Sequence, residues 1–190
     1  MAFYKSEVVQ MLISVITISL AFSIGLLVSF PMVFLTVGVG FILHEIAHKL
    51  VAIRFGCKAF YKMWVEGLVL ALIFAIATGG KFVFAAPGAV YIYKHNLTRR
   101  ENGLISLAGP LTNVLLAFVF FFMMLGPNPF FQELGRWGFS INLFLAMFNM
   151  LPFPPLDGSK VISWNSSVWF IVMAVSAVLF FFPQALLAIF

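Results

Sequence analysis

Long apolar runs separated by short polar segments dominate the hydrophobic pattern of this chain of 190 residues. Several runs approach the roughly 20 residues that a helix needs to cross the hydrocarbon core of a bilayer. The first run is too long for the core of a signal peptide and lacks a clear cleavage site, so we expect it to remain as a membrane helix. The expected spans are about 8–30, 31–53, 103–125, 137–151 and 168–190.

The segment 54–93 departs from this pattern. Its first part, 54–66, mixes basic and aromatic residues, which suits a membrane interface. An apolar run follows at 67–78, but it is short for a spanning helix. We therefore expect 54–93 to form a re-entrant or membrane-surface element. A crossing at 67–78 with a return through 82–93 is a less economical alternative.

The residues 82–93 are rich in β-formers and are interrupted by Pro87-Gly88. This pattern predicts a hairpin or a bent strand rather than a helix. Irregular backbone at membrane depth must be covered by protein or line a wet cavity.

The composition supports a membrane protein: 63% of the residues are hydrophobic and 9% are charged, whereas soluble domains carry about 25% charged residues. The predicted fold class is an all-α integral membrane bundle of about five to six transmembrane helices with a small membrane-associated β-hairpin or re-entrant element. No linker divides the chain, so we expect a single membrane domain over 1–190.

The net charge of +5 has its simplest explanation in lipid headgroups and membrane topology, and we expect no nucleic-acid partner. If 54–93 does not cross, most basic residues fall on one side of the membrane and Arg136 falls on the other. The positive-inside rule then places the N-terminus in the cytoplasm. The residues on the basic side are Lys5, Lys49, Arg54, Lys58, Lys62, Lys94, Arg99, Arg100 and Lys160.

The sequence His44-Glu45-Ile46-Ala47-His48 lies inside the second apolar run, near its expected cytoplasmic end. Histidines four residues apart share one helix face and can bind Zn²⁺ together, and Glu45 can act as general base toward a water molecule. The alternative is a chance match or a polar helix end. Ionisable residues are costly in hydrocarbon, which favours a functional site.

A catalytic zinc site needs a third protein ligand. Asp157 follows a proline-rich segment at the cytoplasmic end of the fourth span, so it can reach the depth of His44 and His48. A turn aspartate is the alternative. His95 lies in a polar connection, where we expect a solvated interface histidine.

Three motifs in order resemble the site-2 protease family of intramembrane zinc metalloproteases: HEIAH at 44–48, GPLTN at 109–113 and NMLPFPPLDG at 149–158. The resemblance covers roughly 30–160. It implies an extra N-terminal helix at 8–30, a catalytic core at 31–160 and a C-terminal helix at 168–190. The chain resembles a minimal form of the family, without PDZ or CBS domains.

The resemblance implies one Zn²⁺ per chain, held by His44, His48 and Asp157, with Glu45 as the catalytic acid and base. It makes Asn149 a candidate for holding the substrate backbone or the oxyanion. Asn113 is a weaker substrate-binding candidate, since it also suits a polar contact between helices that Gly109 brings close together.

The family also suggests that the Phe82–Tyr93 strand, with Pro87 and Gly88 as its candidate residues, receives an extended substrate by edge pairing. A structural hairpin is the alternative.

These inferences predict a zinc-dependent intramembrane endopeptidase that cuts in or near a transmembrane segment of a membrane-protein substrate, in regulated intramembrane proteolysis. We expect a multi-pass protein of the cell membrane, in contact with lipids, with its active site toward the cytoplasm. A zinc-binding but non-proteolytic pseudoprotease is the alternative. A transporter is disfavoured because we find no internal repeat.

Overall fold

The computed structural model describes residues 4–25 and 30–183, which contain seven helices and one two-stranded sheet. The residues 26–29 of the first expected span and 184–190 of the last lie outside the described residues. The elements are α1 (Lys5–Ser23), α2 (Phe30–Arg54), β1 (Lys58–Met63), α3 (Val65–Ala77), β2 (Gly88–Tyr93), α4 (Arg99–Met124), α5 (Pro129–Asn149), α6 (Asp157–Trp164) and α7 (Ser166–Phe181).

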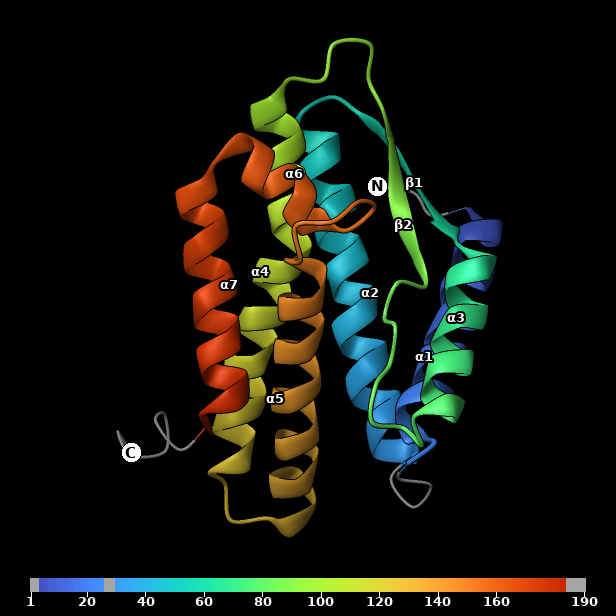
Figure 1. The fold of residues 1–190 in the computed structure, drawn as a ribbon, viewed down its shortest axis with the longest axis vertical. Coiled ribbons are helices and arrows are strands. Elements are labelled where there is room, and N and C mark those ends of the chain that lie inside the picture. The colour runs from blue at the N-terminus through green and yellow to red at the C-terminus, as the bar shows by residue number, and fades with distance from the viewer. Residues whose placement is uncertain (1–3, 26–29, 184–190) are drawn as a thin grey trace.

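The helices form one elongated bundle with α2 in its middle (Figure 1). α1, α3 and the β1–β2 hairpin lie on one side of α2, and α4, α5 and α7 lie on the other. Three described helices, α1, α2 and α4, are long and apolar enough to cross a membrane, and α3 and α7 are shorter apolar helices. The predicted all-α membrane bundle with a small hairpin is confirmed.

Local sequence signals set several helix ends. Thr98 caps α4 by accepting a hydrogen bond from the Glu101 N–H, and the Glu101 carboxylate bonds back to Thr98. Asn128 caps α5, with Pro129 in its first turn. α5 therefore begins at Pro129, eight residues before the predicted start of the fourth span at 137.

The β-hairpin differs from the prediction in its first strand. Residues 82–87 form neither helix nor strand, and β2 pairs antiparallel with β1, in a register that runs from Lys58↔Tyr93 to Met63↔Gly88. The whole of α3 is inserted between the two strands. Part of 54–66, whose basic and aromatic residues suit a membrane interface, thus forms β1, and its place at an interface stays a prediction.

α3 is not confined to one end of the bundle. It runs beside α1, and Gly79 and Gly80, which follow it with positive φ angles, contact the backbone of Gly25 beyond the end of α1 (Figure 1). The chain then returns through 82–87 to the start of β2. This path suits the crossing alternative, and both interpretations of 54–93 stay predictions until the membrane side of each end is measured. Lys81, which the charge balance omitted, follows Gly80 at that far end.

A buried ion pair ties the hairpin to the helices. Glu7 on α1 accepts hydrogen bonds from Lys49 on α2 at 2.7 and 3.0 Å and from the backbone N–H of Tyr61 on β1 at 2.9 Å. Both charged side chains are at most 4% exposed. Three elements therefore meet at the Glu7 carboxylate. Its partner Lys49 directly follows His48 in the sequence.

Candidate metal centre and active site

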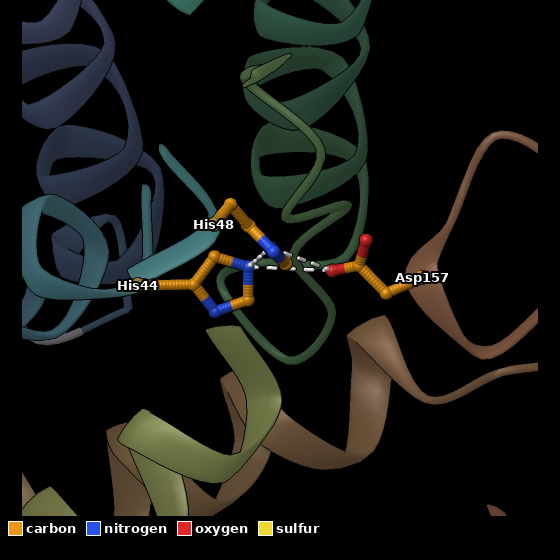
Figure 2. Close-up of side chains that lie close together, drawn as sticks. All are labelled: His44, His48 and Asp157. Carbon is orange, nitrogen blue, oxygen red and sulfur yellow. Dashed lines mark hydrogen bonds and ion pairs between the residues drawn. The ribbon is translucent and has the colours of Figure 1, made fainter. Parts of the chain in front are cut away.

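The three residues predicted as metal ligands lie together (Figure 2). The Nε2 atoms of His44 and His48 on α2 are 3.0 Å apart. Oδ2 of Asp157, the first residue of α6, lies 3.4 Å from His44 Nε2 and 3.1 Å from His48 Nε2. The three ligand atoms fall within 4.8 Å of one another, so one ion can contact them all.

The segment between α5 and α6 brings Asp157 to the histidines. α5 ends at Asn149, before the prolines at 152, 154 and 155, which cannot continue a helix. The indole of Trp169 on α7 donates to the Met150 carbonyl at 2.7 Å, which fixes the start of the turn. Gly158 then lies so close to the carbonyls of Met150 and Leu151 that a Cβ would collide with them. Asp157 therefore reaches the centre from a tightly packed turn.

The Nδ1 atoms of both histidines, which lie on the far side of each ring from the shared point, face hydrogen-bond acceptors. His44 Nδ1 lies 2.5 Å from Asn113 Oδ1, and His48 Nδ1 lies 2.7 Å from the carbonyl oxygen of Ile105. Because these oxygens only accept, each Nδ1 carries the proton and each Nε2 keeps its lone pair. Both lone pairs are directed at the shared point, which is the arrangement that metal-binding histidines need.

Gly109 on α4 leaves the space beside the Nε2 atoms open. A Cβ at this position would press against the ring nitrogens of both His44 and His48. The glycine therefore allows α4 to approach α2 while a small cradle remains at the point where the ligand atoms converge. A metal ion fits this cradle.

The Asp157 carboxyl suits a metal ligand electrostatically. Burial raises the pKa of the Asp157 carboxyl group, but the charge and hydrogen bonds of a protonated imidazole at His48 or His44 outweigh it and hold that pKa below its ordinary value, and a bound cation would act in the same direction. The group is therefore a carboxylate at neutral pH.

Glu45 lies in the same cavity as the three residues. The cavity has a volume of about 590 Å³ and extends from the cluster to the inner side of β2. Glu45 is buried, and its Oε2 atom has no hydrogen-bond partner within the described chain. Such an atom is costly unless a ligand or water meets it, so the carboxylate is available for chemistry beside the cluster.

One edge of β2 faces this cavity. The N–H of Tyr61 on β1 points to Glu7, away from β2, so Tyr61 and Val90 form a non-hydrogen-bonded pair. The backbone groups of Val90, and by alternation those of Gly88 and Ile92, are therefore directed to the opposite edge of β2. The described chain has no further strand there, which leaves an edge that can pair with a peptide.

The residues predicted to contact the substrate, Asn149, Pro87 and Gly88, all lie at the cavity. Asn149 lines the cavity, with its Nδ2 bonded to the Leu145 carbonyl of its own helix at 2.9 Å. Pro87 and Gly88 line it too, and the Pro87 carbonyl accepts from the Trp64 N–H. Their functional roles stay predictions.

His95 is exposed and bonds to Asn96, outside the cluster.

Asn113 is fully buried and binds across helices. Its Oδ1 meets His44, and its Nδ2 donates to the Gly40 carbonyl at 3.1 Å and to Asn142 Oδ1 at 2.9 Å. This is the interhelical contact that the sequence left open. The predicted substrate-binding role stays untested.

The sequence reasoning missed two groups at the centre. One is the backbone carbonyl of Ile105, for which side-chain patterns carry no signal. The other is Asn142, seven residues before Asn149 and on the same face of α5. An asparagine inside a long apolar run is costly in a membrane and could have marked it.

The donor set fits zinc. Two imidazole nitrogens and one carboxylate oxygen, with room for a fourth ligand, are typical of catalytic zinc sites. The cradle at Gly109 and the unpartnered oxygen of Glu45 are both compatible with an ion at this point.

Three curated relatives carry names that begin "Putative zinc metalloprotease". MJ0611 of Methanocaldococcus jannaschii is 50% identical over 175 residues, which cover 90% of each chain. YwhC of Bacillus subtilis is 31% identical over 151 residues, 70% of this chain and 68% of the relative. Rip2 of Mycolicibacterium smegmatis is 31% identical over 135 residues, 61% of this chain and 50% of the relative.

No family model and no solved structure matches the chain. The identity to MJ0611 along nearly the whole length nevertheless decides the family, in agreement with the three motifs. The chain belongs to the site-2 protease family of zinc metalloproteases.

Proposed function

We propose that the protein is a zinc-dependent intramembrane endopeptidase, with one zinc ion per chain, that hydrolyses a peptide bond in or near a transmembrane segment of another membrane protein. One observation carries the proposal: the ligand atoms of His44, His48 and Asp157 converge beside an unpartnered oxygen of Glu45 in one cavity. Such cleavage would serve regulated intramembrane proteolysis.

A bound zinc ion would polarise the scissile carbonyl and make a water molecule nucleophilic near neutral pH. Glu45 takes the proton from that water and returns it to the leaving amine, as its place beside the cluster allows. Asn149 turns its amide from the Leu145 carbonyl to the substrate backbone or to the developing oxyanion.

The inner edge of β2 holds the substrate. A helical peptide hides its carbonyls in its own hydrogen bonds, so it must unwind before attack. An unwound segment that pairs with the backbone groups of Val90 and Ile92 recovers hydrogen bonds in the cavity and presents its carbonyl to the cluster. The apolar side chains along the cavity suit residues of a transmembrane segment.

The basic residues support an orientation in the membrane. The start of α1, the end of α2, the hairpin, the start of α4 and α6 lie toward one end of the bundle, whereas α3 ends and α5 begins toward the other (Figure 1). Nine lysines and arginines lie in or next to the first group of elements, and Lys81 and Arg136 follow the end of α3 and the start of α5. The positive-inside rule then places the N-terminus and the active site toward the cytoplasm in a multi-pass protein of the cell membrane. Lipids surround the apolar helices.

Zinc content and cleavage of a transmembrane test substrate in liposomes test the proposal. We expect about one zinc per chain in the wild type. Glu45→Gln should keep the zinc and slow cleavage by about 10²–10⁴-fold, because it lacks the proton acceptor. Asp157→Ala should lose both zinc and cleavage.

Normal cleavage by Glu45→Gln would contradict the role of Glu45. Full zinc and activity in Asp157→Ala would contradict the ligand set. Zinc binding by the wild type without turnover of any membrane substrate would favour the pseudoprotease.

A further inference from the structure

Buried side-chain amides continue from the candidate metal centre through three helices. His44 on α2 contacts Asn113 on α4, and Asn113 contacts Asn142 on α5. We propose that Asn142 is a positioning residue for His44 and acts through Asn113. The inference rests on the proposed zinc site.

The amide of Asn113 has one orientation that satisfies all its contacts. The two hydrogens on Nδ2 go to the carbonyl of Gly40 and to Oδ1 of Asn142. Oδ1 is then the atom left to accept from His44 Nδ1. A flipped amide would set its N–H against the N–H of His44 and its oxygen against two other oxygens, which costs several unmade hydrogen bonds in a dry site.

Asn142 receives its own orientation from its helix. Its Nδ2 donates to the carbonyl of Gly138, one turn earlier, at 2.8 Å. Its Oδ1 is therefore directed at Asn113 and not away from it. Asn113 and Asn142 are both 0% exposed, so water does not replace a lost contact easily. The amide of Asn142 on α5 thus orients the amide of Asn113 on α4, which in turn orients the ring of His44.

The consequence for His44 is a fixed tautomer. An acceptor at Nδ1 holds the proton there and leaves Nε2 free for the metal. Without Asn142, one hydrogen of Asn113 loses its acceptor and the flipped amide becomes less unfavourable. Changes to groups that orient metal ligands typically weaken metal binding about 10–100-fold.

Gly40 offers a second way to disturb this contact without removing an amide. A Cβ at Gly40 would come 2.6 Å from Oδ1 of Asn142, so an alanine must displace that side chain from Asn113. Gly38 lies two residues earlier on the same helix, and a Cβ there meets only Cγ1 of Val15 at 3.4 Å. Gly38→Ala is therefore a matched control.

Zinc affinity tests the proposal by competition with a chelator in detergent. We expect Asn142→Leu and Gly40→Ala to bind zinc about 10–100-fold more weakly than the wild type, with unchanged helix content. Gly38→Ala should bind like the wild type. Thr36→Val, which removes a buried hydroxyl that bonds only to its own helix, should do the same.

A ¹⁵N-histidine spectrum of the metal-free protein provides a readout that does not depend on zinc. The chain has three histidines, so the signal of His44 is identifiable. At a pH where the imidazoles are neutral, we expect His44 to carry its proton on Nδ1 in the wild type and to show a tautomer mixture in Asn142→Leu.

The proposal fails if Asn142→Leu and Gly40→Ala bind zinc as tightly as the wild type, or if wild-type His44 is protonated at Nε2. These results leave the proposed function intact when the wild type binds zinc. A wild type that binds no zinc removes the proposed function instead. If Asn142→Leu does not fold, the ¹⁵N spectrum and the zinc affinity of Gly40→Ala, which displaces the Asn142 side chain without removing it, decide the role of Asn142.

Discussion

Gly109 shows how one residue can decide whether the centre accepts a metal. A side chain there would meet the ring nitrogens of both His44 and His48. We expect Gly109→Ala to reduce zinc content to a small fraction of the wild-type value while the helices form normally, since alanine is favourable in a helix. Zinc analysis with circular dichroism checks this.

Gly109→Ala needs a control variant with the same substitution elsewhere. Gly103→Ala is a less suitable choice, since a Cβ at that position collides with Trp164. Gly126→Ala is better, because its Cβ would approach only the Met123 carbonyl, at 3.3 Å, outside the centre. Full zinc loading of Gly109→Ala would show that the ion lies elsewhere.

The sequence predicts the residues at the centre better than the contacts that orient them. His44, Glu45 and His48 stand out because such residues are costly in an apolar run, and Asp157 stands out because prolines precede it. The acceptors on the two Nδ1 atoms do not stand out. One is a backbone carbonyl, and the direction of the Asn113 amide depends on α2 and α5, which only the packed bundle brings together.

At the scale of elements, β2 has two edges with different surroundings. One edge pairs with β1, and the other faces the cavity through the backbone groups of Val90 and its alternate neighbours. Ile92→Pro removes an N–H on the cavity side and keeps the ladder to β1, because proline is tolerated at a strand edge.

We expect Ile92→Pro to lower kcat/KM for a transmembrane substrate by about tenfold or more, the equivalent of one lost hydrogen bond of about 1.4 kcal/mol, with zinc content unchanged. Ile92→Ala removes only side-chain atoms and is the control. Equal cleavage by the wild type and Ile92→Pro would argue against edge pairing.

The Glu7–Lys49 pair is the second element-scale feature, since it joins α1, α2 and β1. Glu7→Ala removes the carboxylate that both Lys49 and the Tyr61 N–H bind. We expect a loss of stability of about 3 kcal/mol, as for other broken buried pairs, and faster hydrogen exchange in β1. Thermal unfolding and exchange mass spectrometry measure these effects.

The less buried pair of Lys94 and Glu101 is the control, since its side chains are 27% and 19% exposed. Removing Lys94 should change the stability little, because solvent screens such pairs. A similar loss in both variants would mean that burial does not distinguish the two pairs.

The interruption of the hairpin by α3 could not be predicted from local patterns. β1 is short and partly charged, and its partner strand begins 25 residues after it ends. Such a pairing depends on contacts that form only when α3 packs beside α1. The long helices, in contrast, follow from apolar length and capping alone.

For the whole molecule, the path of α3 makes a topological prediction. α3 and β2 end at opposite ends of the bundle (Figure 1), and Lys81 and Lys94, which follow those two ends, are only 13 positions apart. In a Cys57→Ala background, we expect a membrane-impermeant maleimide to label Lys81→Cys from outside the cell and Lys94→Cys only after the membrane is opened.

The Cys57→Ala background removes the native cysteine, which is itself poorly reactive because it is buried and burial raises the pKa of its thiol. Labelling of both introduced cysteines from the same side would show that α3 does not cross.

His48 and Asp157 are 109 positions apart, although their side chains nearly touch. A chain still emerging from the ribosome therefore holds two of the three predicted ligand residues for most of its synthesis and receives the third only after α5 has been made. A nascent chain cannot assemble the complete centre before its helical bundle is nearly finished. The order of synthesis thus delays the completion of the centre until most of the helices around its cavity have been made.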